Sequence, residues 1–201
     1  MTSRHVTGVV LAGGLGRRFG APKAGLLFKG EPLLDRTAVL LEGIANEVLI
    51  VGRPPLPLVT HRAPRTHAIV DRVPDAGPLV GLATALDYCH PGALIVVACD
   101  MPLLSASLLA HEARLLAEGG ADAVVPVVHG VVQPLHAVYS TRLASIVERL
   151  LARGASSLRS LIDEARVRYL GRDEWGTFSP DGRSFTNVNT AAELRAAEAI
   201  V

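Results

Sequence analysis

The chain has 201 residues, which is enough for one sizeable α/β domain with a substantial core, and we expect a single domain over residues 1–201. Its 20 basic and 19 acidic side chains give a formal net charge of +1, and aromatic residues make up 4% of the sequence. This charge balance gives no electrostatic reason to propose nucleic acid or an anionic membrane as a partner, and the low aromatic content excludes a stacking platform for single-stranded nucleic acid.

Cysteine usage and hydropathy point to the cytoplasm. Cys89 and Cys99 are the only cysteines, which is too few for a disulfide framework, and they lack the paired spacing of a zinc site. The N-terminus lacks a long apolar signal core, and no apolar run approaches the roughly 18 residues that a membrane span requires. We therefore expect a cytoplasmic protein without a membrane segment.

The first predicted element is a buried strand that ends in a glycine-rich loop. Residues 6–11 are largely apolar, which is typical of a strand covered on both faces of a parallel sheet. The loop that follows combines glycines with cations, namely Gly13, Gly14, Gly16, Gly20, Arg17, Arg18 and Lys23. Phe19 stands where the dinucleotide fingerprint needs glycine, and Ala21 where a Walker A loop needs lysine. The loop predicts a binding site for phosphate groups, and a glycine-rich turn with incidental surface arginines is the alternative.

Beyond this loop the sequence alternates between helix and strand patterns. Helical spacing is found over 33–44, 79–88, 108–118, 141–152 and 156–164 and in a closing helix rich in Ala and Glu, and strand patterns over 47–51, 67–70, 93–98, 122–128 and 167–170. Residues 52–64 are proline-rich and predict a surface connection, while Gly130 marks a hairpin into 131–138. The alternation predicts a mostly parallel sheet with helices on both faces.

Two aspartates follow predicted strands at their carboxyl ends. Asp71 follows 67–70 and Asp100 follows 93–98. Because ligands of parallel sheets bind outside the carboxyl ends of the strands, we expect both aspartates and the glycine-rich loop to meet at one edge. Asp100 is the carboxylate that we expect to hold Mg²⁺, although capping of the next turn explains it equally well. Asp71 has the same two explanations, with binding to nucleotide hydroxyls as the functional one.

The remaining polar residues give no sign of covalent catalysis. The seven histidines show no paired metal spacing, and His136 is assigned no role. The chain has no Gly-x-Ser-x-Gly elbow, and neither cysteine has the surroundings of a nucleophile. A bound nucleoside triphosphate would need its phosphate charge neutralised, for which Lys23 and a divalent metal would serve.

Five motifs follow one another along nearly the whole chain. They are Leu11-Ala12-Gly13-Gly14 with Arg18-Phe19-Gly20 and Lys23, Asp71 with Gly77-Pro78-Leu79-Val80-Gly81, Cys99-Asp100-Met101-Pro102, Gln133-Pro134-Leu135, and Asn187-Val188-Asn189-Thr190. In this order they resemble the molybdenum cofactor guanylyltransferases of the MobA type. The resemblance implies a Rossmann-like nucleotidyltransferase fold, Mg²⁺ as cofactor, and transfer of GMP from GTP to the terminal phosphate of molybdopterin with release of pyrophosphate.

The resemblance also implies roles for single residues. Leu11, Ala12, Gly13 and Gly14 would bind GTP through the backbone, with Asp71 and Asp100 as further contacts on the GTP side. Lys23, Arg18 and Asp100 would form the catalytic set, in which the two cations contact phosphates and Asp100 binds Mg²⁺. Asn187 and Asn189 would lie on the acceptor side or around the metal. Residues 1–104 would then form the GTP and Mg²⁺ side, and residues 105–201 the molybdopterin side.

Two alternatives remain open. A molybdopterin cytidylyltransferase would share the fold and the acceptor, but its loop resembles Leu-Ala-Ala-Gly, and Gly13 favours guanine. A non-catalytic nucleotide-binding module would keep the fold without turnover, and the presence of both Lys23 and Asp100 argues against it. The partners implied are GTP and molybdenum-molybdopterin as substrates, with transient contacts to molybdopterin-handling proteins or apo-molybdoenzymes.

Overall fold

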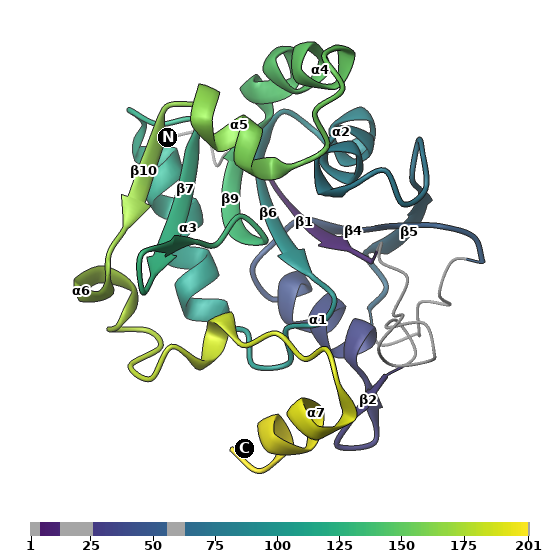
Figure 1. The fold of residues 1–201 in the computed structure, drawn as a ribbon, viewed down its shortest axis with the longest axis vertical. Coiled ribbons are helices and arrows are strands. Elements are labelled where there is room, and N and C mark those ends of the chain that lie inside the picture. The colour runs from purple at the N-terminus through teal and green to yellow at the C-terminus, as the bar shows by residue number, and fades with distance from the viewer. Residues whose placement is uncertain (1–4, 13–25, 56–62, 201) are drawn as a thin grey trace.

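The computed structural model describes residues 5–12, 26–55 and 63–200 (Figure 1). Its strands are β1 (His5–Leu11), β2 (Leu27–Phe28), β3 (Glu31–Pro32), β4 (Glu47–Gly52), β5 (Thr66–Val70), β6 (Gly92–Ala98), β7 (Ala123–Val128), β8 (Val131–Val132), β9 (His136–Ser140) and β10 (Val167–Leu170). The central sheet has the order β10-β7-β9-β6-β1-β4-β5, with β8 paired to β7, and β2 and β3 form a separate two-stranded sheet.

Most of the central sheet is parallel, as the sequence predicts. β1 pairs in parallel with β4 and β6, β4 with β5, and β7 with β10. The exception is β9, which runs antiparallel between β6 and β7. The sequence predicts one continuous run over 131–138, whereas the chain leaves the β7–β8 hairpin at Gln133 and enters β9 at His136. Pro134 lies in this break, where a residue without a backbone N–H donor interrupts no ladder.

Helices cover both faces of the sheet (Figure 1). They are α1 (Leu33–Glu42), α2 (Pro78–Tyr88), α3 (Ala106–Glu118), α4 (Ala144–Ala152), α5 (Leu158–Glu164), α6 (Arg172–Trp175) and α7 (Ala191–Glu198), with 3₁₀ turns η2 (Thr141–Leu143) and η3 (Arg183–Phe185). α1 and α3 pack on one face, and α2, α4 and α5 on the other. Successive side chains of β1 alternate accordingly, with Val10 in the first core and Val9 and Leu11 in the second. Within the described ranges, no helix is long and apolar enough to cross a membrane.

The ends of α3 have identifiable physical causes. The Ser105 side chain accepts a hydrogen bond from the Leu108 amide at 3.3 Å and caps α3. Gly119, at φ +93°, ends the same helix. The predicted helix over 141–152 begins with the 3₁₀ turn η2 and continues as α4. The sequence did not predict the small β2–β3 sheet, α6 or η3.

The strand order creates a reversal beside β1. From β1 the chain continues through β4 and β5 on one side, and then returns to β6 on the other side of β1. The connections that leave β1 and β6 therefore diverge, and a crevice is expected outside the carboxyl ends of these two strands. Leu11 ends β1, and Ala98 ends β6 and is followed directly by Cys99 and Asp100.

Candidate active site

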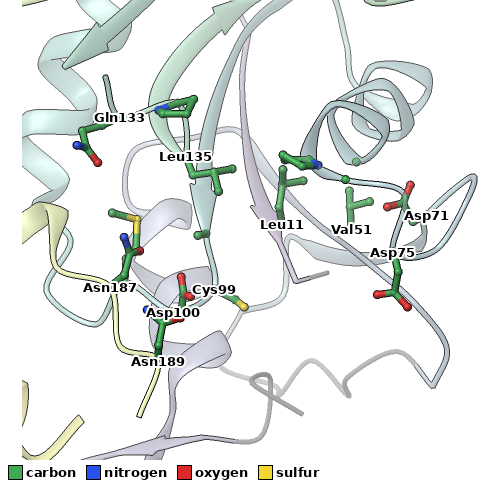
Figure 2. A pocket seen from close by; sticks show the side chains of 16 residues that line it. Leu11, Val51, Asp71, Asp75, Cys99, Asp100, Gln133, Leu135, Asn187 and Asn189 are labelled. Atoms are coloured by element: carbon green, nitrogen blue, oxygen red, sulfur yellow. The ribbon is translucent and has the colours of Figure 1, made fainter. Parts of the chain in front are cut away.

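A cavity of about 580 Å³ lies at this reversal, outside the carboxyl ends of β1 and β6. Figure 2 shows two polar walls, one with Asp100 and the other with Asp71 and Asp75. Leu11 and Leu135 lie between the two walls (Figure 2). The predicted meeting of Asp71 and Asp100 at one edge of the sheet is thus confirmed, and the two carboxyl groups face the cavity from opposite sides.

The wall of Asp100 joins two motifs that are far apart in the sequence. The Val188 amide donates a hydrogen bond to the Asp100 carbonyl oxygen at 2.9 Å. Val188 is fully buried in an apolar cluster with Phe28, and because side chains alternate along extended backbone, its neighbours point the other way. Figure 2 shows Asn187 and Asn189 beside Asp100. The Asn-x-Asn pattern therefore has a structural explanation: the middle residue anchors the segment, and the two amides face the cavity.

The start of α7 fixes this segment further. The Thr190 hydroxyl caps the helix by accepting the Glu193 amide at 3.2 Å, while the Glu193 carboxylate accepts the Asn189 amide at 2.6 Å. These reciprocal bonds are similar to a capping box, shifted by one residue. The backbone on both sides of Asn189 is thereby held in place.

The opposite wall is built by β5 and α2. The Asp71 amide donates to the Gly52 carbonyl at 2.8 Å, which continues the β4–β5 pairing to the residue after the strand. Its Oδ1 accepts the hydroxyl of Thr84 from α2 at 2.7 Å. Oδ2 lies toward Gly81, which also lines the cavity. Asp71 is buried and oriented from two elements, so its carboxylate has a defined direction.

The Gly-Pro-Leu-Val-Gly motif allows α2 to approach the sheet closely. Gly77 has φ +105°, and a Cβ at this position would lie 2.6 Å from the Ser156 carbonyl oxygen. A Cβ on Gly81 would lie 3.0 Å from Leu11 at the end of β1. The Leu79 amide bonds to the Ser156 carbonyl at 3.0 Å, and the Gly81 amide to the Gly77 carbonyl at 3.3 Å. These first amides of α2 are thus used within the protein, and the motif acts through helix position.

The Gln133-Pro134-Leu135 motif is a turn held by the residues around it. The buried Tyr139 hydroxyl donates to the Pro134 carbonyl at 2.8 Å, and the Ala98 amide donates to the Leu135 carbonyl at 3.2 Å. The phenol is protonated at neutral pH and can donate this bond, and burial raises the pKa of Tyr139 above its ordinary value. The turn therefore presents Gln133 and Leu135 to the cavity in a fixed position (Figure 2).

A buried polar network behind this turn was missed from the sequence. His136 Nε2 lies 2.7 Å from the Ser184 hydroxyl, and Nδ1 lies 3.3 Å from the Glu112 carboxylate. All three side chains are buried, and burial raises the pKa of Glu112 against the opposing effect of His136. The network links α3, β9 and η3 and has no access to a substrate. Its one sequence signal was Glu112 itself, a carboxylate on the apolar face of a helix that also carries Leu108.

The described lining of the cavity carries negative charge. The lining includes three aspartates and, among the described residues, no lysine or arginine. Asp75 forms an ion pair with Arg53 at 3.4 Å. Asp71 and Asp100 both line the cavity (Figure 2). A polyanionic ligand would be repelled by such a lining unless cations accompany it. Carboxylate and amide oxygens, as supplied by Asp100 and Asn187, are hard donors that suit Mg²⁺.

Of the residues predicted to bind phosphate groups through the backbone, the structure describes Leu11 and Ala12. Leu11 lines the cavity, while the Ala12 amide donates to the Val51 carbonyl at 2.8 Å and so extends the β1–β4 pairing. The predicted loop residues that lie outside the described ranges are Gly13, Gly14, Gly16, Arg17, Arg18, Gly20 and Lys23. Their assignment stays a prediction from the sequence.

A cavity at the reversal of a doubly wound sheet, with a carboxylate at a strand end, is the usual position of a ligand site in α/β proteins. Residues 8–169 match the sequence profile of the MobA-like NTP transferase domain. The chain is 35% identical over 192 residues to the probable molybdenum cofactor guanylyltransferase of Bacillus licheniformis, covering 94% of this chain and 95% of that protein. It therefore belongs to the MobA-like NTP transferase family, which confirms the resemblance inferred from the motifs.

Two further relatives also match this chain over nearly its whole length. The molybdenum cofactor guanylyltransferase of Desulfosudis oleivorans is 32% identical over 197 residues, covering 98% of this chain and 96% of that protein. The crystal structure of molybdopterin-guanine dinucleotide biosynthesis protein A from Archaeoglobus fulgidus superimposes with a TM-score of 0.78 at 27% identity, covering 96% and 97% of the two chains. The likeness thus extends over both walls of the cavity.

Proposed function

We propose that this protein transfers GMP from GTP to the terminal phosphate of molybdenum-molybdopterin, forming molybdopterin guanine dinucleotide and pyrophosphate. Membership of the family and the names of its full-length relatives support this reaction. The observation that carries it is the hydrogen bond from Val188 to the Asp100 carbonyl, which joins the strand-end carboxylate to the Asn-x-Asn segment on one wall of the cavity.

The reaction requires placement and charge neutralisation rather than a covalent intermediate. The acceptor phosphate is already a nucleophile, and it needs an in-line position beside the α-phosphate of GTP. Asp100 would hold Mg²⁺ at the end of β6, where the ion would neutralise negative charge on the phosphates. Asn187 and Asn189 would orient groups on the acceptor side, since both amides lie beside Asp100 (Figure 2).

The donor side would be formed by the first half of the chain. Asp71, oriented by Thr84, would accept hydrogen bonds from nucleotide hydroxyls. Gly13 and Gly14 would contact the phosphates through their amides, with Lys23 and Arg18 supplying the positive charge that the described lining lacks. Residues 1–104 would bind GTP and Mg²⁺, and residues 105–201 would supply the molybdopterin side. We further propose a cytoplasmic location and transient contacts with apo-molybdoenzymes or molybdopterin-handling proteins.

Thermal unfolding with GTP, CTP or ATP, each with and without Mg²⁺, tests the donor site. A ligand that binds the native state alone stabilises it by about 2.7 kcal/mol at 100-fold excess over Kd, so nucleotide selectivity is measurable. We expect stabilisation by GTP above the other nucleotides, with a Mg²⁺-dependent part that disappears in Asp100→Ala. Selectivity for CTP would favour a cytidylyltransferase, and no effect of any nucleotide would overturn the donor site. Binding of GTP without release of pyrophosphate when molybdopterin is present would favour the non-catalytic module.

A further inference from the structure

Three potential metal ligands converge at the end of the sheet opposite the cavity. His5 begins β1, Glu47 begins β4, and His90 lies two residues before β6. β1 is paired with both other strands, with Thr7 opposite Glu47 and His5 opposite Gly92. The strand order therefore brings together side chains that are more than 40 positions apart, which is why the sequence showed no metal spacing among the histidines.

The ligand atoms already surround a common point. His5 Nε2 and His90 Nδ1 each lie 3.3 Å from the same Glu47 oxygen, Oε1. All three ligand atoms lie within 4.8 Å of one another, and the two imidazole rings are 4.7 Å apart between centroids. Ligands bound tetrahedrally at about 2.0–2.1 Å stand roughly 3.4 Å apart. The two nitrogen–oxygen distances are close to this value without any rearrangement. In the part of the chain that the structure describes, this is the one group of three such side chains.

The surroundings hold the carboxylate and leave the site open. The Thr7 hydroxyl donates to Glu47 Oε1 at 3.1 Å, as an outer partner that orients a ligating carboxylate would. Burial acts to raise the pKa of Glu47, but hydrogen bonds from His90, Thr7 and His5 outweigh it and hold the pKa below its ordinary value. The side chain of His90 is 68% exposed and that of Glu47 19% exposed, so an ion can enter and keep water as a further ligand.

We propose that His5, Glu47 and His90 form a binding site for one divalent transition metal, with Zn²⁺ as the best match. Two imidazoles and one carboxylate are a typical Zn²⁺ ligand set, whereas Mg²⁺ prefers oxygen ligands alone. The site lies at the opposite end of β1 from Asp100 and does not depend on the proposed reaction. A bound ion would link the starts of β1 and β4 with the connection from α2 to β6.

Calorimetric titration with Zn²⁺ tests the proposal. The protein must carry no histidine tag, because the histidines of a tag would bind Zn²⁺ themselves. Bound metal must first be removed with a chelator. We expect one Zn²⁺ per chain, with affinity reduced at least tenfold in His90→Ala. The matched control is His67→Ala, which removes an exposed histidine from β5 and should leave the affinity unchanged. Asp100→Ala should also leave it unchanged.

Two further readouts separate ligation from a structural role. Thr7→Val keeps the shape of a buried side chain but removes the outer hydrogen bond, and should weaken Zn²⁺ binding by about tenfold. Co²⁺ bound in place of Zn²⁺ should give visible absorption in wild type that is lost in His90→Ala, with His90→Gln as the substitute if circular dichroism shows that the alanine variant does not fold. The proposal is overturned if metal-free wild type takes up no Zn²⁺ at micromolar concentration, or if His90→Ala binds it as tightly as wild type.

Discussion

Polar side chains gather near both ends of β1, but in different arrangements. At the carboxyl end, Asp71 and Asp100 face a cavity of about 580 Å³ from opposite walls, with Leu11 between them. At the amino end, His5 and His90 both lie 3.3 Å from one oxygen of Glu47. A site for a large organic anion separates its polar groups and leaves space, whereas a site for one ion gathers them around a point. The same strand order, with β1 between β4 and β6, produces both.

The largest expected effect concerns the carboxyl end. Asp100→Asn keeps the size of the side chain and removes the charge that would hold the metal, and guanylyl transfer should fall by at least about 100-fold, as when other transition-state stabilising groups are removed. The matched control is Asp163→Asn, on the exposed surface of α5, which should retain activity. Initial rates of pyrophosphate release measure both. Equal rates in the two variants would remove Asp100 from the catalytic set.

A second change tests whether the cavity wall depends on the close approach of α2. Gly77→Ala places a Cβ only 2.6 Å from the Ser156 carbonyl oxygen, at a residue whose φ is +105°. We expect a loss of about 2–3 kcal/mol in the free energy of unfolding, measured with urea. Gly154→Ala is the control, because Gly154 also has a positive φ of +80° but open space around it. Its expected cost is about 1 kcal/mol. Equal costs would show that contact with Ser156 is unimportant.

A third variant separates the acceptor from the donor side. Asn187→Ala removes an amide beside Asp100 without touching the buried anchor Val188. We expect the KM for molybdopterin to rise about tenfold, the value of one good hydrogen bond to a charged group, while stabilisation by GTP stays within about twofold of wild type. Steady-state kinetics and thermal unfolding measure the two quantities. A variant that loses GTP binding and keeps its KM for molybdopterin would place Asn187 on the donor side.

The smallest expected effect concerns Glu47, in the cluster with His5 and His90. In the absence of metal, hydrogen bonds hold the pKa of Glu47 below its ordinary value of 4.5 in the folded protein. A lowered pKa contributes stability above the unfolded value, and this contribution is lost as pH falls through the folded pKa. Glu47→Gln should therefore cost about 0.5–1 kcal/mol at pH 7 and less at pH 3, because the contribution declines as the pH falls below 4.5. Urea unfolding with a chelator present checks this, and an equal cost at both pH values would contradict it.

The sequence predicted the parts of the site that follow from position along the strands. Asp71 and Asp100 were expected at one edge because they end parallel strands, and the sheet places them around one cavity. Asn187 and Asn189 were expected on the acceptor side or around the metal from resemblance alone. The hydrogen bond from Val188 that brings them beside Asp100 depends on tertiary contacts. The glycine-rich loop was inferred from composition, and its predicted residues 13–25 lie outside the described ranges.

What could not be predicted depends on contacts between distant segments. His5 and His90 meet Glu47 because β1 lies between β4 and β6, and no local spacing encodes that order. His136 was assigned no role because its partners, Glu112 and Ser184, are 24 positions before and 48 positions after it. The antiparallel insertion of β9 likewise depends on pairing with β6 and β7, whereas the hairpin signal at Gly130 specified only the local turn.

The central claim is that the cavity at the carboxyl end of β1 joins a guanine nucleotide to molybdopterin. The most direct measurement incubates the protein with molybdenum-molybdopterin, Mg²⁺ and either GTP or CTP, and quantifies dinucleotide product and pyrophosphate. The account predicts guanine dinucleotide and pyrophosphate in equal amounts from GTP, with CTP a much poorer donor. Cytosine dinucleotide as the main product, or no product from either nucleotide while GTP still binds, would contradict it.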